Sequence, residues 1–153
     1  MSVETSLAVR RFAPEGAPAG PPVLLLHGFA SDGPTDWLST GWPAALTAVG
    51  RAVLVPDLPG HGSSPAPADA AAATAKAVTG ELARAVGDVS EVDVVGYSLG
   101  ARLAWELPAL LPVRRLVLAG ISPHEPFGAV DVQAALAFAD GGRLPGDPLT
   151  AAV

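Results

Sequence analysis

Four short apolar runs, separated by helix-forming stretches, constrain the fold of this chain more than any other feature. A continuous apolar run is typical of a strand that is buried on both faces of a sheet. Strands that alternate with helices predict an α/β fold, a mainly parallel sheet with helices on both faces. The runs occupy residues 23–28, 52–57, 92–97 and 116–121.

Other segments extend this α/β pattern. Residues 7–13 alternate between apolar and polar side chains, which favours an early strand. We expect Asp69 to be the N-cap of the second helix and Pro108 to end or kink the third. After residue 121 only one further helix is expected, before a tail rich in Gly and Pro. The predicted helices span residues 42–49, 69–87, 98–107 and about 130–139.

The composition excludes several classes of function. The net charge is −6, and the basic residues cluster no further than Arg10–Arg11 and Arg114–Arg115, so we expect no nucleic acid partner. The chain has no cysteine, which excludes disulfides, thiolate metal sites and cysteine catalysis. No signal pattern and no membrane-length apolar stretch are found, so we expect a cytoplasmic protein with no membrane, metal or cofactor.

The pentapeptide GYSLG, residues 96–100, has the Gly-x-Ser-x-Gly pattern of a nucleophilic serine on a sharp strand-to-helix turn. Gly96 and Gly100 are small, as required where the strand and the helix meet. Ser98 lies at a helix N-terminus, and the Leu99 N–H is placed there to bind an oxyanion. The alternative is a turn of small residues in which the serine hydroxyl is satisfied by hydrogen bonding.

Two further strands end in specific turns. The first ends in His27-Gly28-Phe29, where Gly28 permits a sharp turn and the Phe29 N–H is a second candidate oxyanion donor. We expect His27 to hold this loop rather than to act as a base. The second ends in DLPGHG, where Asp57 and His61 are expected to be structural, with His61 as a less favoured base.

Together, the strand ends HGF, DLPGHG and GYS resemble the α/β-hydrolase fold superfamily, in its cap-bearing, esterase-like branch. The resemblance covers about residues 7–122. It implies that Ser98 is the nucleophile and that the Phe29 and Leu99 N–H groups form the oxyanion hole. It also implies two parts, an N-terminal hydrolase core at 1–122 and the start of an incomplete lid at 123–153.

The partners that the resemblance requires for Ser98 are not evident in the chain. In the family the acid and then the histidine follow the serine. The only histidine after Ser98 is His124, a poor candidate for the base, and Glu125 or Asp131 is a poorer one for the acid. We therefore expect a core truncated after the strand that follows the nucleophile helix, or a complete chain with another role. The reading frame beyond Val153 would decide between these.

Three functions follow from these observations. The first is hydrolysis of a small-molecule acyl substrate such as an ester, thioester or lactone, through Ser98. The second is a non-catalytic module for binding or assembly. The third, a nucleotide-binding domain, is disfavoured because no G-x-G-x-x-G follows a strand.

Two expectations concern apolar surface. Trp37 and Trp42 either line an acyl pocket or belong to the core, whereas Trp105 on the nucleophile helix is expected to pack. Strand 116–121 would be an open edge, so we expect self-association through it.

Overall fold

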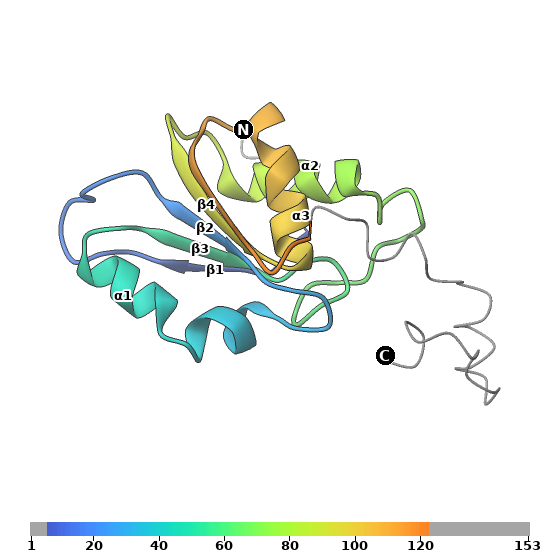
Figure 1. The fold of residues 1–153 in the computed structure, drawn as a ribbon, viewed down its shortest axis with the longest axis horizontal. Helices are drawn as coiled ribbons and strands as arrows, with labels where there is room; N and C mark the ends of the chain where they lie inside the picture. Colours follow the sequence, from blue (N-terminus) through green and yellow to red (C-terminus); the bar gives the residue numbers. More distant parts are fainter. Residues whose placement is uncertain (1–5, 123–153) are drawn as a thin grey trace. The chain divides into compact units, whose positions relative to one another are not determined.

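A five-stranded sheet runs through residues 6–122, the part of the chain that this computed structural model describes (Figure 1). The strand order is β1-β3-β2-β4-β5. Strand β1 pairs antiparallel with β3, and the other three pairings are parallel. The predicted mainly parallel α/β sheet is thus confirmed. The strands are β1 (Val9–Phe12), β2 (Val23–Leu26), β3 (Val53–Pro56), β4 (Val92–Tyr97) and β5 (Val113–Ala119).

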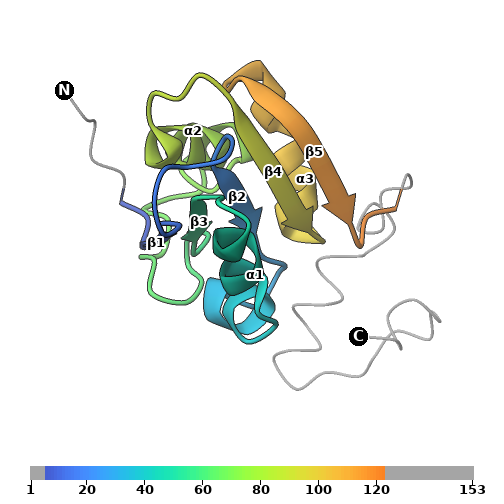
Figure 2. The ribbon, with the colours of Figure 1, turned by 90° about the vertical axis from the view of Figure 1, so that its left-hand side faces the viewer.

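Helices cover both faces of this sheet, as Figures 1 and 2 show. The single-turn π-helix η1 (Pro34–Leu38) and helix α1 (Trp42–Ala48) lie on one face. Helices α2 (Ala75–Val86) and α3 (Leu99–Glu106) lie on the other, and the 3₁₀ turn η2 (Leu107–Ala109) continues α3. Each of the helices α1, α2 and α3 connects one strand of the parallel part of the sheet to the next strand in the chain. Such crossover connections are expected between parallel strands.

The two faces of the sheet carry separate apolar clusters because successive strand residues point to opposite sides. In β2, Leu24 and Leu26 join the cluster beneath α2 and α3, which contains Leu82 and Leu103. The neighbouring Val23 and Leu25 join the cluster beneath η1 and α1. Since all four β2 residues are at most 3% exposed, the continuous apolar run marks a central strand, as predicted.

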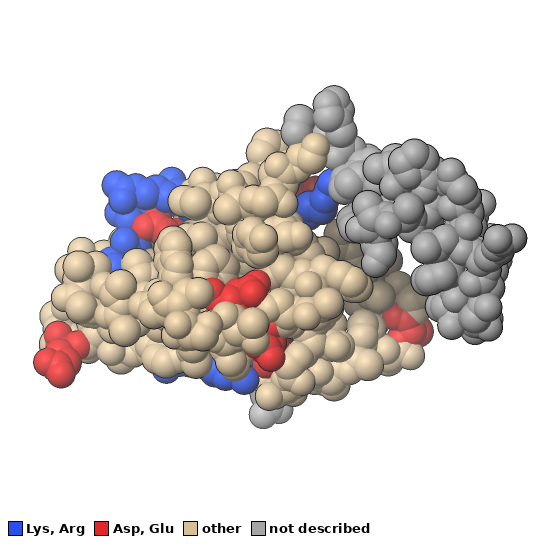
Figure 3. Space-filling model, turned by 60° about the horizontal axis from the view of Figure 1, so that its bottom comes forward, with Lys and Arg blue, Asp and Glu red and all other residues tan. Residues whose placement is uncertain are grey.

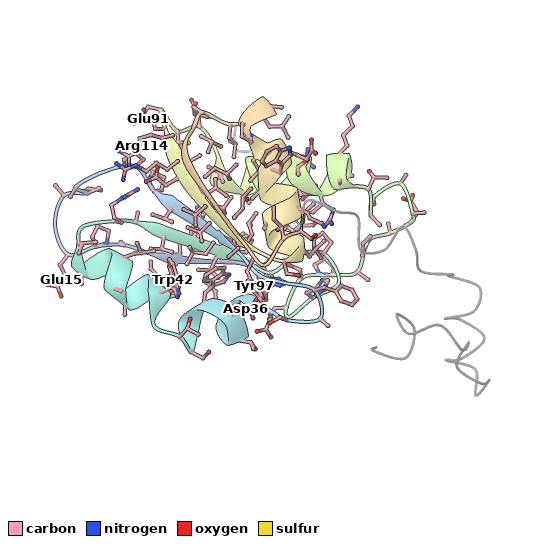
Figure 4. All side chains as sticks on the ribbon, viewed as in Figure 1. Glu15, Asp36, Trp42, Glu91, Tyr97 and Arg114 are labelled. Carbon is pink, nitrogen blue, oxygen red and sulfur yellow. The ribbon has the colours of Figure 1, made fainter. Side chains whose placement is uncertain are left out.

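An ion cluster ties the strands together at their amino ends. The Asp93 carboxylate in β4 accepts hydrogen bonds from Arg114 at 2.9 and 2.6 Å and from Arg51 at 2.6 Å. The Arg114 hydrogen bonds, followed by those of Arg51, lower the pKa of Asp93 to about 2, against the opposing effect of burial. Figure 4 shows Arg114 and Glu91 at the end of the sheet opposite to Tyr97 and Asp36.

The last strand begins and ends earlier than the sequence pattern predicts. β5 spans Val113–Ala119 instead of 116–121. The apolar run starts at Leu116, but Val113 already pairs with Val92 of β4. Arg114 is accommodated within the strand because Asp93 on the neighbouring strand binds its guanidinium group.

The second helix also begins later than predicted, so the assignment of Asp69 as its N-cap is wrong. The N-cap of α2 is Thr74, whose hydroxyl oxygen accepts the Ala77 N–H at 3.3 Å. Asp69 instead closes a turn by accepting the Ala72 N–H at 2.8 Å. Helix α3 ends before Pro108, as predicted, whereas the helix expected at about 130–139 lies outside the described residues.

The surface of the described part gives two further observations. Within residues 6–122 no helix has the length and apolar character that crossing a bilayer requires. On the face seen in Figure 3, acidic and basic side chains are few and most of the surface belongs to other residue types.

Strand β5 is an edge of the described sheet, since β4 is its only neighbour there (Figure 2). Unpaired strand edges favour pairing between chains. We expect the chain to self-associate as its concentration rises and Val117→Lys to weaken this, because a charge on an edge strand opposes pairing. Val117 is 51% exposed, so the fold tolerates the change. Light scattering measures the self-association of the wild type and of the Val117→Lys variant. Val49→Lys, which is remote from β5, is the control. A wild-type chain that stays monomeric would refute the predicted self-association.

Candidate active site

Ser98 has an unusual backbone conformation at the junction of β4 and α3. Its φ of 52° and ψ of −112° are sparsely populated by residues other than glycine. Only Ala30 shares a positive φ with it among the non-glycine residues of the described chain. Such a conformation costs on the order of 1–3 kcal/mol and persists where the surrounding structure imposes it.

The two glycines of GYSLG allow the strand, the helix and a neighbouring strand to approach one another closely. A Cβ atom added at Gly96 would lie 2.5 Å from the Gly100 carbonyl oxygen. One added at Gly100 would collide with the Leu26 carbonyl oxygen and lie 2.6 Å from that of His27. These contacts are with backbone atoms, so no side-chain movement relieves them. Gly100 therefore brings the elbow against the carboxyl end of β2.

The Ser98 hydroxyl is not used to cap its own helix. Ser98 is the N-cap residue of α3, but its side chain makes no capping hydrogen bond, and the side chain is only half-buried. A serine in the usual extended N-cap conformation would accept a backbone N–H. The Leu99 N–H, which opens the helix, has no intrahelical partner because the first N–H groups of a helix never do.

The HGF turn lies directly beside the elbow. A Cβ atom added at Gly28 would lie 3.5 Å from the Ser98 Cβ. Phe29 follows at the tip of the turn with 73% of its side chain exposed. Within residues 6–122 its N–H donates to no other group. The structure thus brings both predicted oxyanion donors, Phe29 and Leu99, to segments that border Ser98.

His27 links the HGF turn to the DLPGHG turn. The ring is fully buried, its Nε2 accepts the Leu58 N–H at 2.9 Å, and its Nδ1 lies 2.8 Å from the Gly28 carbonyl oxygen. Because Leu58 N–H is a donor, the ring proton must be on Nδ1, where it donates to Gly28. Burial lowers the pKa of His27, with a smaller contribution from nearby His61. Both ring nitrogens are therefore engaged in holding the two turns together.

We expect this link to make stability depend on pH. His27 has a lower pKa folded than unfolded, so the unfolded chain takes up the proton first as the pH falls. Its contribution is complete above its ordinary pKa of about 6.5 and is lost progressively below it. Urea unfolding between pH 8 and 5 measures this loss. Replacement of His27 by Asn should lower stability at pH 8 and flatten its fall with pH, and an unchanged slope would contradict the assignment.

Asp57 organises the DLPGHG turn. Its buried carboxylate accepts hydrogen bonds from the Arg10 guanidinium, the Gly33 N–H and the Ser63 N–H at 2.8 to 2.9 Å. Burial acts to raise the pKa of Asp57, but the amides of Ser63 and Gly33 and the Arg10 guanidinium outweigh it, so the pKa is lowered. The Ser64 hydroxyl also donates to the Asp57 carbonyl oxygen at 2.6 Å.

His61 lies in the same region as the candidate oxyanion loop. Its ring centroid is 5.3 Å from that of His27 and 5.9 Å from that of Phe29. Its Nδ1 is 3.0 Å from the Pro59 carbonyl oxygen. No hydrogen bond joins His61 to Ser98 in the described chain. The other candidates for base and acid, His124, Glu125 and Asp131, lie outside the described residues.

The three tryptophans differ in environment. Trp37 is buried in the cluster beneath η1, and Trp42 packs edge-on against it with centroids 5.3 Å apart. Trp37 is therefore a core residue, while Trp42 is 41% exposed at the start of α1. The expectation that Trp105 packs is wrong, because it is 66% exposed. The buried stripe of α3 is formed by residues 100, 101, 103 and 104, and Trp105 lies outside it.

Sequence reasoning missed Asp36 and Arg10. Asp36 accepts the Gly28 N–H at 2.8 Å, and Arg10 in β1 is the cationic partner of Asp57. Neither residue belongs to a recognisable motif, and Arg10 is separated from Asp57 by 47 positions. Only the pairing of β1 with β3 brings it near, so no local signal reveals it.

Comparison with known proteins supports the fold assignment. Residues 21–149 match the model of the alpha/beta hydrolase fold family. Over 67% of its length the chain is 36% identical to Epoxide hydrolase 3 of Siraitia grosvenorii and 38% identical to a pimeloyl-[acyl-carrier protein] methyl ester esterase of Aromatoleum aromaticum. Among solved structures, an N-acyl homoserine lactonase, AidH, bound to N-butanoyl homoserine aligns with a TM-score of 0.66 and 26% identity over 88% of this chain.

These matches cover only part of the relatives. The aligned region spans 32% of the epoxide hydrolase, 38% of the esterase and 51% of the lactonase chain. The family match over residues 21–149 includes strands β2 to β5 and the serine elbow. From the family match and the sheet topology together, we conclude that this chain belongs to the alpha/beta hydrolase fold family.

Proposed function

We propose that Ser98 is the nucleophile of a hydrolase that acts on a carboxylic ester, thioester or lactone. Two features of Ser98 carry this proposal. Its backbone is strained, and its hydroxyl makes no capping hydrogen bond to helix α3. The Phe29 and Leu99 N–H groups act as the oxyanion hole, because they lie on the two segments that border Ser98 and neither is engaged in a hydrogen bond among residues 6–122. Two such donors stabilise the negative oxygen that forms in acyl transfer.

The reaction then has two steps. The Ser98 oxygen adds to the substrate carbonyl carbon, its proton passes to a base, and the alcohol, thiol or ring oxygen leaves with a proton. Water adds to the resulting acyl-serine, releasing the carboxylic acid and restoring the hydroxyl. The base is a histidine oriented by an acid, as in Ser-His-Asp sites. Within residues 6–122 no histidine is hydrogen-bonded to Ser98, so the proposal places the base beyond that region.

A serine nucleophile favours acyl substrates over epoxides, although both classes occur in the names of the relatives. Attack of a serine oxygen on an epoxide carbon would leave an alkyl ether. An ether has no carbonyl carbon to which water can add, so the enzyme would not be regenerated. Attack on an acyl group leaves an ester, which water hydrolyses through the same oxyanion hole.

Covalent labelling tests the proposal. We expect a fluorophosphonate to modify the longest chain that the gene encodes at Ser98, with one phosphonyl group per molecule found by mass spectrometry. Ser98→Ala should abolish labelling, while the matched variant Ser90→Ala should retain it, since Ser90 is an exposed residue before β4. Loss of the histidine of a catalytic triad lowers the turnover rate by a factor of about 10⁶. The rate of fluorophosphonate labelling should therefore depend on whether the chain that is tested contains the base.

The alternative is a non-catalytic module for binding or assembly. The absence of a histidine partner for Ser98 among the described residues favours it. It predicts that the longest encoded chain reacts with the fluorophosphonate no faster than the Ser98→Ala variant does. That result would refute the proposed hydrolase.

A further inference from the structure

The loop that carries Phe29 is held by a carboxylate that no motif predicted. The Asp36 Oδ2 accepts the Gly28 N–H at 2.8 Å, and its Oδ1 accepts the Ser31 hydroxyl at 2.6 Å. Asp36 belongs to η1, which is anchored because the next residue, Trp37, is buried in the core. The carboxylate therefore ties the beginning and the middle of the exposed loop to a fixed support.

Two other groups complete the surroundings of Gly28. The His27 Nδ1–H donates to its carbonyl oxygen at 2.8 Å. The Tyr97 ring lies on its remaining side, where an added Cβ would be 3.2 Å from Tyr97 Cδ1. Figure 4 shows Tyr97 and Asp36 at the same end of the sheet. Gly28 is thus held at its N–H, its carbonyl and its open face.

Holding Gly28 also determines the direction of the Phe29 N–H. The Gly28 carbonyl and the Phe29 N–H belong to one planar trans peptide, so they point in opposite directions. The loop beyond is otherwise weakly held, since Phe29 and Ala30 are exposed and Ala30 has a φ of 54°. Without the Asp36 carboxylate, Gly28 and Ser31 both lose their tether to η1.

We propose that Asp36 is a positioning residue that aims the Phe29 N–H at the substrate oxygen that becomes negative when Ser98 adds to the carbonyl carbon. This inference rests on the proposed function and adds a residue to it. Asp36 acts from both sides of the Gly28–Phe29 peptide, because its carboxylate accepts the Gly28 N–H just before that peptide and the Ser31 hydroxyl just after it. Its removal affects the transition state, where the oxyanion exists, more than the initial binding of a neutral carbonyl or phosphonyl compound.

Fluorophosphonate kinetics separate these two effects. Displacement of a catalytic group by about 1 Å costs on the order of 100-fold in rate, so we expect Asp36→Ala to lower the maximal rate of labelling about 10- to 100-fold. The concentration for half-maximal rate should stay unchanged. Asp36→Asn should restore most of the rate, since an amide oxygen can accept the Gly28 N–H while its NH₂ donates to Ser31.

Asp32→Ala is the matched control. Asp32 lies in the same loop, but its carboxylate accepts the Thr35 N–H at 2.7 Å and does not contact Gly28. We expect this variant to label at the wild-type rate. Equal rates for wild type and Asp36→Ala would overturn the inference while leaving Ser98 as nucleophile. A loss of rate in Asp36→Ala that Asp36→Asn does not restore would also overturn it.

The Phe29 amide resonance provides a readout that needs no reaction. In ¹H–¹⁵N spectra we expect Asp36→Ala to shift the Phe29 amide and Asp36→Asn to return it towards its wild-type position. Asp32→Ala should leave it in place. If the wild-type chain is not labelled at all, the proposed function fails, and this resonance alone decides whether Asp36 orients the peptide. An unmoved Phe29 amide in Asp36→Ala refutes that orientation.

Discussion

Gly100→Ala is expected to destabilise the domain by at least about 3 kcal/mol, beyond the usual cost of an overpacked site. The new methyl group would collide with the Leu26 carbonyl oxygen and lie 2.6 Å from the His27 carbonyl oxygen. Both atoms belong to backbone at the carboxyl end of β2, so the collision forces α3 away from the sheet. Chemical denaturation monitored by circular dichroism measures the loss.

Gly80→Ala is the matched control for this prediction. Gly80 lies within α2, and a Cβ atom there would meet only the Arg84 Nη1, at 3.8 Å. Alanine is the better helix former, so this change should stabilise the chain by about 0.5–1 kcal/mol. The same Gly→Ala substitution is thus expected to lower stability at position 100 and to raise it at position 80. A Gly100→Ala variant as stable as the wild type would show that the elbow does not require close approach to β2.

Asp57→Asn is expected to cost about 2–4 kcal/mol, although it changes neither the size nor the shape of the side chain. The carboxylate accepts three donors, from Arg10, Gly33 and Ser63. In asparagine one oxygen becomes an NH₂ group, which would face at least one of these donors whichever way the amide is turned. Arg10 is only partly buried and recovers some hydration, which limits the loss.

The control for Asp57 is Asp69→Asn. Asp69 is exposed and accepts only the Ala72 N–H, which an amide oxygen can also accept. Its effect should remain within about 0.5 kcal/mol. The lowered pKa of Asp57 adds a second test, because its contribution is present above the ordinary carboxyl pKa and is lost as the pH falls through the folded value. Wild type and Asp57→Asn should therefore converge in stability on acidification. A difference that persisted in acid would contradict the role of the charge.

The local sequence was sufficient to predict where the central strands lie along the chain. Continuous apolar runs predicted β2, β3 and β4 almost to their ends, because a strand that is buried on both faces admits only apolar residues. The boundary of β5 was misplaced because an arginine within a strand looks like an interruption unless its partner, Asp93, is known. The start of α2 was misplaced because the run of alanines after Asp69 has high helix propensity but forms turns ahead of Thr74.

What the sequence by itself determined is the α/β class of the fold and the position of Ser98 between two obligatory glycines. Both depend on neighbouring residues, through apolar periodicity and through the steric demands of one turn. Only the tertiary structure decided what surrounds that serine. Tyr97 lies against Gly28 only once β4 has paired with β2, and Arg10 reaches Asp57 only once β1 has paired with β3. Asp36 reaches Gly28 across eight positions, through the conformation of the loop that leads into η1. Interactions between residues distant in the chain leave no periodic or local trace in the sequence.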